Sequence, residues 1–269
     1  MVVSVPFDAD PARMLRAVAQ AGVTTLEAQL TRLKALAGPI SDAGLRGVSA
    51  FIPTPMVTGN WALYEAYDRK RGQPPASAAY PLDAAIADAR TLGLRNLVVI
   101  NLLPGERRTL DDYKRFAEQM RIAAERCGGA GLALHYHPHS FEYEPLGGSV
   151  PIEMLAEQLS GANSGLEVDV FWVAMAGRDP AEFIRRHAAS VRAIHLKDRL
   201  KSAPIYTGPQ YEAPAGLRVP IGSGSIDFRA VIDAVDTAVV SALYIEDESA
   251  GDRLDNTLKS VAYLRGIGV

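Results

Sequence analysis

The stretch from Leu166 to Lys197, LEVDVFWVAMAGRDPAEFIRRHAASVRAIHLK, contains the pattern that decides the fold. It opens with an apolar run of strand type over 166–171 and closes with a second one over 193–197. Between them, Asp179 and Pro180 form a helix-start signal ahead of an amphipathic run. A strand, a helix and a second strand in this order predict a parallel βαβ unit.

The same alternation extends in both directions from this stretch and gives eight strand-helix pairs. The expected strands are 2–6, 25–29, 47–52, 96–102, 133–137, 166–171, 193–197 and 243–247. Eight such units predict a closed (β/α)8 TIM barrel in a single domain over residues 1–269. An open doubly wound sheet would share the local pattern. No GxGxxG motif follows the first strand, which weakens the dinucleotide-binding form of that alternative.

Length, composition and charge limit the possible partners. The chain has 269 residues, close to the usual size of one such barrel, and 48% of them are hydrophobic, which is enough for a large core. A net charge of -3 gives no electrostatic signature of binding to nucleic acid or to an anionic membrane. The start of the chain lacks a signal-peptide pattern, and the single cysteine, Cys127, allows no internal disulfide. We expect a cytoplasmic protein, and the sequence leaves open whether it forms a homo- or hetero-oligomer.

Two connections are longer than the others, and both follow the C-terminal end of a strand. They run from Pro53 to Ala79 and from Arg199 to Gly224. Barrel enzymes bind substrate on the face where the strands end. We therefore expect these segments to act as lids or as walls of the pocket.

Residues able to bind a metal fall at or just beyond the ends of four successive strands. They are Glu142, Asp169, His195 and Glu246. Neighbouring strands are about 5 Å apart, so these side chains can converge on one ion at the mouth of the barrel. Three buried carboxylates repel one another, and a divalent cation would offset that repulsion. Oxygen-rich ligation with one imidazole favours Mn, Mg or Co over Zn.

Alternation of side chains along the strands assigns further residues to the interior. His195 and Lys197 share one face of their strand, so Lys197 is expected to bind a substrate oxygen or else to pair with Asp169 or Glu167. Glu142 lies in the loop after its strand. If the register differs from the expected one, Glu144 or His137 would supply that ligand instead.

Three histidines, His135, His137 and His139, alternate along the fifth expected strand. An imidazole next to a metal suits proton transfer at neutral pH, so His137 is the leading acid-base candidate, together with the carboxylates of Glu142 and Glu246. Alternatively, His137 orients Glu142 through a hydrogen bond. His139 and Trp172 are expected to contact substrate, because an aromatic ring at a barrel mouth can pack against the apolar face of a sugar, although Trp172 suits a purely structural wall as well.

Five segments of the chain carry a family resemblance. HYHPHSFEY, LEVDVFWVAMAGRDP, AIHLKD, VPIGSGSIDF and LYIEDE resemble, in this order, the signature segments of sugar phosphate isomerase/epimerase proteins of the xylose-isomerase-like superfamily. The resemblance implies a TIM barrel with one divalent metal held by Glu142, Asp169, His195 and Glu246. Members of this superfamily include epimerases, aldose-ketose isomerases, inosose dehydratases and enzymes that cleave oxidised glycosides, and the resemblance does not choose among them.

The expected activity is isomerisation or epimerisation of a small sugar or keto-sugar by proton transfer through an enediolate. Expulsion of a β-oxygen from the same intermediate would make the enzyme a dehydratase, or a lyase that cleaves an oxidised glycoside. A nuclease of the endonuclease-IV type is disfavoured, because Trp172 stands where that pattern needs a histidine and the net charge is negative. A non-catalytic accessory subunit is disfavoured by the intact set of four metal-binding residues.

Overall fold

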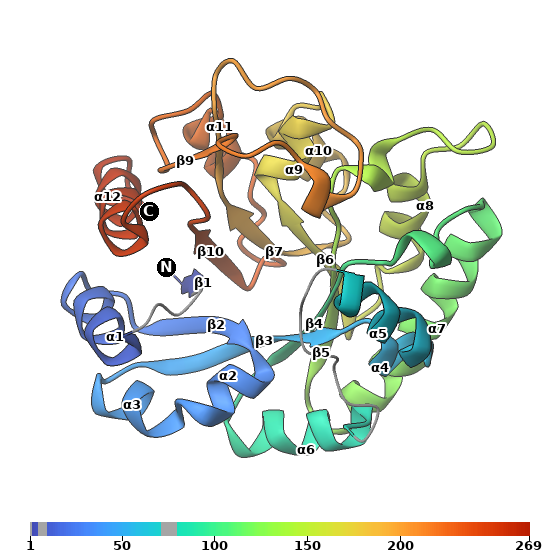
Figure 1. The fold of residues 1–269 in the computed structure, drawn as a ribbon, viewed down its shortest axis with the longest axis horizontal. Coiled ribbons are helices and arrows are strands. Elements are labelled where there is room, and N and C mark those ends of the chain that lie inside the picture. Colours follow the sequence, from blue (N-terminus) through green and yellow to red (C-terminus); the bar gives the residue numbers. More distant parts are fainter. Residues whose placement is uncertain (1, 5–9, 71–79) are drawn as a thin grey trace.

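Eight parallel strands form a closed barrel in the computed structural model, which describes residues 2–4, 10–70 and 80–269 (Figure 1). The order around the barrel is β1-β10-β7-β6-β5-β4-β3-β2, so the first and last strands pair and close it. The strands are β1 (Val2–Ser4), β2 (Thr25–Gln29), β3 (Arg46–Pro53), β4 (Asn96–Ile100), β5 (Ala133–His137), β6 (Ser164–Asp169), β7 (Val191–Leu196) and β10 (Ala242–Glu246). The predicted (β/α)8 barrel is confirmed, and each strand lies where the sequence indicated one.

Some expected boundaries differ from those observed. The strands β6 and β7 begin two residues earlier than predicted, and β4 ends two residues earlier. The strand β6 also ends two residues earlier, because Asp169 already caps the next helix. Residues 5 and 6 of the first predicted strand and residues 71–79 of the first long connection lie outside the described residues.

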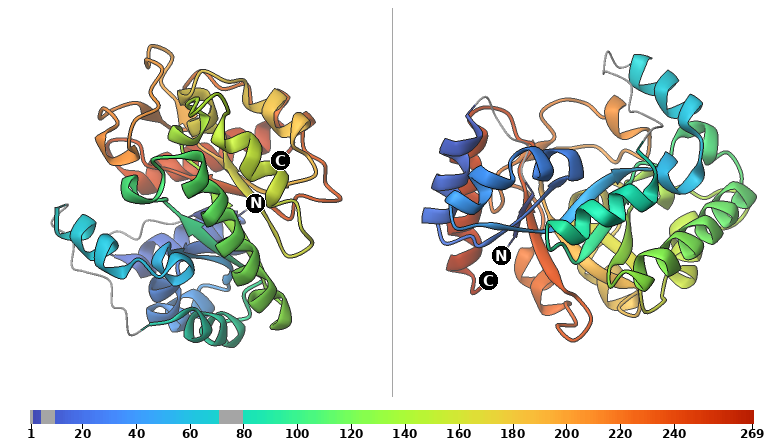
Figure 2. Two further views of the ribbon diagram at one scale, coloured as in Figure 1. Left: turned by 90° about the vertical axis from the view of Figure 1, so that its right-hand side faces the viewer. Right: turned by 90° about the horizontal axis from the view of Figure 1, so that it is seen from below.

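Helices surround the barrel, as Figure 2 shows from two further directions. The predicted start at Asp179 is confirmed, because its carboxylate accepts the Glu182 N–H at 2.8 Å and Pro180 occupies the first turn. The α-helices are α1 (Pro11–Gln20), α2 (Leu30–Ala35), α3 (Ala37–Asp42), α4 (Pro55–Thr58), α5 (Trp61–Lys70), α6 (Leu82–Thr91), α7 (Leu110–Gly129), α8 (Pro151–Gln158), α9 (Val170–Met175), α10 (Pro180–Arg186), α11 (Phe228–Asp233) and α12 (Arg253–Gly266). Short 3-10 turns are η1 (Pro104–Glu106), η2 (Phe141–Tyr143) and η3 (Gln210–Glu212).

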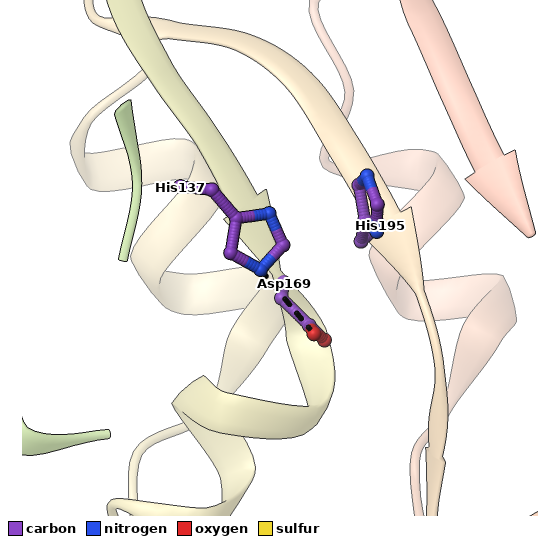
Figure 3. A group of neighbouring side chains, drawn as sticks. All are labelled: His137, Asp169 and His195. Carbon is purple, nitrogen blue, oxygen red and sulfur yellow. Dashed lines mark ion pairs between the residues drawn. The ribbon is translucent and has the colours of Figure 1, made fainter. Parts of the chain in front are cut away.

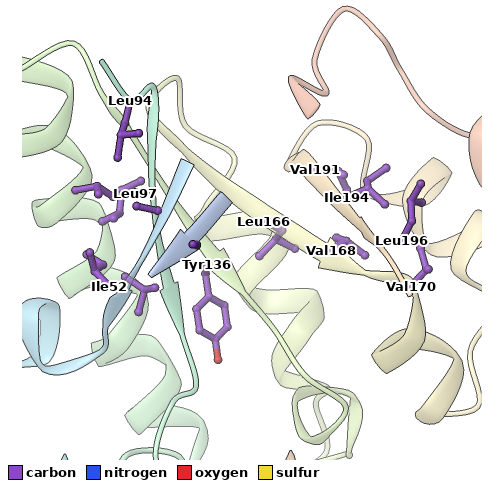
Figure 4. Packing of buried hydrophobic residues seen from close by; sticks show 14 of the residues in the cluster. Ile52, Leu94, Leu97, Tyr136, Leu166, Val168, Val170, Val191, Ile194 and Leu196 are labelled. Atoms are coloured by element: carbon purple, nitrogen blue, oxygen red, sulfur yellow. The ribbon is translucent and has the colours of Figure 1, made fainter. Parts of the chain in front are cut away.

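The main hydrophobic core lies between the strands and the helices. Leu166 and Val168 of β6, and Ile194 and Leu196 of β7, pack into it (Figure 4). Because side chains alternate along a strand, the residues between them face the barrel axis. This core therefore fixes which side chains of β6 and β7 are available at the site.

The long connection after β7 is folded over the barrel mouth by an antiparallel pair, β8 (Asp198–Arg199) and β9 (Arg218–Val219). The Asp198 carboxylate accepts the backbone N–H groups of Gly222 at 3.0 Å and Gly224 at 2.7 Å. A Cβ at Gly224 would lie 2.3 Å from the Arg199 carbonyl oxygen, so the close approach requires glycine. Among the described helices, none is long and apolar enough to span a membrane.

Candidate metal centre and active site

Three buried side chains converge where β5, β6 and β7 end. His137, Asp169 and His195 each offer a ligand atom, and these atoms all lie within 4.8 Å of one another (Figure 3). His137 Nε2 is 3.8 Å from Asp169 Oδ2, and Asp169 is paired in register with His195 on the next strand. Asp169 Oδ1 accepts the Phe171 N–H at 2.9 Å, while Oδ2 lies 3.2 Å from the Lys197 ammonium. These two contacts fix the orientation of the carboxylate, with Oδ2 toward the site.

Glu246, at the end of β10, joins this group through a buried lysine. Its Oε2 lies 3.0 Å from His195 Nδ1 and 2.6 Å from Lys197 Nζ. Lys197 Nζ is also 3.2 Å from Asp169 Oδ2, so one ammonium bridges two of the predicted metal-binding carboxylates. Burial would raise the pKa of Glu246, but Lys197 and His195 hold it well below its ordinary value. Glu246 is therefore ionised.

A second group lies deeper in the barrel and shares His195 with the first. His195 Nε2 is 2.7 Å from Glu27 Oε2 on β2 and 3.3 Å from Glu167 Oε2 on β6. Burial, and then the neighbouring Glu167 carboxylate, raise the pKa of Glu27 to about 8. Burial would lower the pKa of His195, but Glu167 and Glu27 raise it well above its ordinary value.

The sequence reasoning missed Glu27 altogether and considered Glu167 only as a partner for Lys197. The signal was present in both cases, because each is a carboxylate between apolar residues of a strand, at a position that alternation turns inward. In the structure, Lys197 forms ion pairs with Asp169 and Glu246. Glu167 instead contacts the imidazole of His137.

The structure places Glu142 apart from the other predicted ligands. It lies in η2, where one of its oxygens accepts the Tyr136 hydroxyl and the other accepts the His139 N–H at 2.9 Å. Tyr136 packs against Phe116 of α7, on the helix side of β5. Burial raises the pKa of Glu142 to about 7. Of the four predicted ligands, the structure thus brings Asp169, His195 and Glu246 together and does not bring Glu142 to them.

A cavity of about 150 Å³ opens beside the metal-binding group. All three predicted substrate contacts line it, namely His139, Trp172 and Lys197. The complete lining is Phe51, Ile100, His137, His139, Trp172, Lys197, Gln210, Tyr211, Arg218, Glu246 and Glu248. Three of these residues, Gln210, Tyr211 and Arg218, come from the connection over the mouth, which supports the expectation that this segment forms a wall of the pocket.

Arg218 is a further residue of the cavity that the sequence reasoning missed. Its guanidinium lies 5.1 Å from the Phe171 ring centre and 5.2 Å from that of Trp172, and its Nε is 2.9 Å from Glu248 Oε2. Glu248 also lies 2.9 Å from Lys197 Nζ. One carboxylate thus holds the two cations that face the cavity.

A larger cavity, of about 420 Å³, lies at the opposite end of the barrel, between the starts of β2, β3, β4 and β10. The described side chains that line it include Arg46 and Arg95 but no carboxylate, histidine or cysteine. Size therefore does not identify the candidate active site, whereas the chemistry of the smaller cavity does.

The donor set at the mouth fits a divalent metal ion. Buried carboxylate oxygens and imidazole nitrogens converge there, and Asp169, Glu246 and Glu248 supply more negative charge than the one ammonium of Lys197 offsets. Such a set suits Mn, Mg, Co or Zn, and the only cysteine, Cys127, lies on α7, outside either group.

Comparison with known proteins agrees with the barrel fold. The inosose dehydratase of Geobacillus thermodenitrificans (strain NG80-2) is 25% identical over 157 residues, which cover 54% of this chain and about half, 49%, of that protein. A sugar phosphate isomerase/epimerase from Parabacteroides distasonis ATCC 8503 superposes with a TM-score of 0.74 at 20% identity, covering 98% of this chain and 93% of that one. The probable 3-DHS dehydratase AsbF of Bacillus anthracis gives 0.72 at 9% identity, covering 98% and 99%.

The family model described as xylose isomerase-like TIM barrel matches residues 15–267, almost the whole chain. The matched segment contains seven of the eight barrel strands and all the residues of the two buried groups. The chain therefore belongs to the xylose isomerase-like TIM barrel family.

Proposed function

We propose that the protein is a divalent-metal-dependent isomerase or epimerase that acts on a small sugar or keto-sugar by proton transfer next to a carbonyl. The observation that carries the proposal is the arrangement of Asp169 and Glu246 around Lys197, with His195 against Glu246, beside a cavity lined by His137. Carboxylates, an imidazole and an ammonium at the mouth of a barrel provide metal ligands, proton acceptors and a group that binds oxygen anions.

Asp169, His195 and Glu246 are the proposed ligands of the ion. Three protein ligands leave coordination positions for substrate oxygens, as in other catalytic metal sites. The resemblance adds Glu142 as a fourth ligand. In the structure, both oxygens of Glu142 accept hydrogen bonds, from Tyr136 and from the His139 N–H, away from the other three ligands. Metal titration of Glu142→Gln, compared with Asp169→Ala, tests whether Glu142 binds the ion.

A divalent ion at this position would polarise a substrate carbonyl and offset the charge that develops when the neighbouring proton leaves. His137 and Glu246 both line the cavity, and we propose that they remove and return that proton. Lys197 Nζ is held among carboxylates, where it can bind a substrate oxygen. Trp172 and Arg218, whose guanidinium lies 5.2 Å from the Trp172 ring centre, also line the cavity, and a sugar ring can pack against the aromatic ring.

A dehydratase or glycoside-cleaving lyase is the second candidate, because loss of a β-oxygen from the same intermediate needs the same residues. It is supported by the similarity to an inosose dehydratase over 54% of this chain. Incubation with keto-sugars and keto-inositols, followed by NMR of the products, separates the two. An epimer or an aldose-ketose pair supports the isomerase, and an unsaturated product supports the lyase.

Elemental analysis of the purified protein tests the shared metal requirement. The proposal predicts close to one divalent ion per chain after dialysis against Mn. A chain that retains no ion under these conditions, while remaining folded, would contradict both candidates.

A further inference from the structure

The larger cavity, at the end of the barrel opposite the metal-binding group, has the size of a ligand site but plays no part in the proposed chemistry. Its volume of about 420 Å³ lies in the range of small-molecule sites. At its inner end, Val48 and Ala242 pack against the fully buried Tyr244. The Tyr244 ring centre lies 5.2 Å from that of His195, so this tyrosine separates the cavity from the metal-binding group.

Two arginines line this cavity and have no partner in the part of the chain that the structure describes. Arg46 begins β3 and Arg95 directly precedes β4. The two strands pair, and the Arg95 N–H donates to the Val48 carbonyl oxygen at 2.9 Å, so these strand starts lie side by side. Neither guanidinium forms an ion pair or a hydrogen bond with a described residue, Val269 at the edge of the same cavity included.

The charge of this lining is the reverse of that at the mouth. Among the described residues that line the larger cavity, no side chain carries a carboxylate, while Thr24 and Thr237 add hydroxyl groups. In the smaller cavity, by contrast, Glu248 contacts the cationic groups of both Lys197 and Arg218. The unpaired cations of this protein that face a cavity are therefore at the end of the barrel away from the mouth, as far as the described residues show.

We propose that the larger cavity binds a phosphoryl group, as free phosphate or as part of a small phosphorylated metabolite, through Arg46 and Arg95. A guanidinium presents its N–H groups in a planar fork that matches phosphate oxygens, and two forks can hold one dianion together. Val48 and Val240 also line the cavity and would contact the organic part of a phosphate ester. This second site is independent of the proposed function at the mouth.

Solvation of two surface arginines is the competing explanation, because both side chains are exposed. Like charges that line one cavity repel each other, and an anion between them would offset that repulsion. Arg121 on α7 shows the usual surface arrangement in this chain, since it pairs with both Glu118 and Glu125. Two arginines on neighbouring strands that face one cavity without such a carboxylate favour a bound anion instead.

Titration calorimetry of the intact Mg-loaded protein with inorganic phosphate tests the proposal. The wild type should bind one phosphate per chain. Arg46→Gln and Arg95→Gln should each weaken phosphate binding about tenfold or more, because each loses hydrogen bonds between charged groups. The control is Arg229→Gln, which replaces an exposed arginine of α11 outside the cavity and should leave the affinity unchanged. Circular dichroism confirms that each variant is folded, as expected for replacements of exposed side chains.

Arg218→Gln distinguishes this site from phosphate binding at the mouth, and it should retain the wild-type phosphate affinity. No saturable binding by the wild type, unchanged binding by Arg46→Gln and Arg95→Gln, or loss of binding in Arg218→Gln alone would overturn the proposal. These outcomes leave the proposed function standing, because none of them measures metal binding or turnover.

Glucose 6-phosphate and glucose separate the two sources of the phosphoryl group. Tighter binding of glucose 6-phosphate than of inorganic phosphate supports a phosphorylated metabolite, and the reverse order supports the free ion. In both cases Arg46→Gln should weaken binding of the phosphate compound. Glucose that displaces phosphate from the wild type as well as glucose 6-phosphate does would contradict recognition of a phosphoryl group.

Discussion

Lys197→Met removes the one cation that lies among three carboxylates at the site. The Lys197 side chain is 4% exposed, and its ammonium lies 3.2 Å from Asp169, 2.6 Å from Glu246 and 2.9 Å from Glu248. Burial would lower the pKa of Lys197, but these carboxylates raise it above its ordinary value, so it is charged throughout the physiological range. Methionine retains most of the volume and removes the charge.

Loss of one partner from a buried ion pair costs about 3–5 kcal/mol, because the remaining charges stay buried without compensation. For a domain of this size each kcal/mol lowers the Tm by about 2–4 °C. Metal-free Lys197→Met should therefore unfold about 6–20 °C below the wild type. Saturating Mn should recover much of the difference, because the ion offsets the same carboxylates.

Calorimetry or circular dichroism with and without Mn measures both values. The surface variant Lys259→Met is the control, since Lys259 pairs with Asp255 in solvent and its loss should change the Tm little. Turnover of Lys197→Met should fall even when it is loaded with metal. If metal-free Lys197→Met has the same Tm as the metal-free wild type, the electrostatic account of the site is refuted. If its turnover is unchanged, Lys197 does not bind substrate and its role is structural.

Three further outcomes are expected. Asp169→Ala and Glu246→Ala should each lose most bound metal by elemental analysis, and full occupancy in both would rule them out as ligands. His137→Ala should retain its metal and fold but lose turnover, whereas loss of metal would make His137 a ligand. Burial raises the pKa of Glu142 from about 4.5 to about 7, so its contribution to stability is largest below pH 4.5 and declines as pH rises to 7. Denaturant titrations should show a smaller decline in Glu142→Gln than in the wild type, because Glu27, whose pKa is raised to about 8, contributes a decline in both, and parallel pH profiles would argue against a raised pKa of Glu142.

The barrel and much of the candidate site could be predicted from local patterns. Alternation of apolar residues in β6 and β7 indicated the inward direction of Asp169, His195 and Lys197, and the structure gives them that direction. Periodicity suffices here because the main core dictates which face of a strand is inside.

The contacts of Glu142 and Arg218 could not be predicted from the sequence. Glu142 follows β5 in a short turn, where strand alternation no longer applies, and its partner Tyr136 becomes apparent only once η2 has folded back. Arg218 lies 21 positions after Lys197 in the chain, and only the β8–β9 pairing brings it to the cavity. Long loops obey no periodic pattern, so their contacts with the site could not be predicted.

Turnover in deuterated water tests the central claim, metal-dependent proton transfer, most directly. The Mn-loaded protein is incubated with a panel of keto-sugars, and proton NMR follows the carbon-bound hydrogen next to the carbonyl. The account predicts that deuterium enters that position during conversion, and that the exchange stops when the metal is removed or when Asp169 is replaced by alanine. Conversion to product without any deuterium incorporation, or exchange that persists without metal, would contradict it.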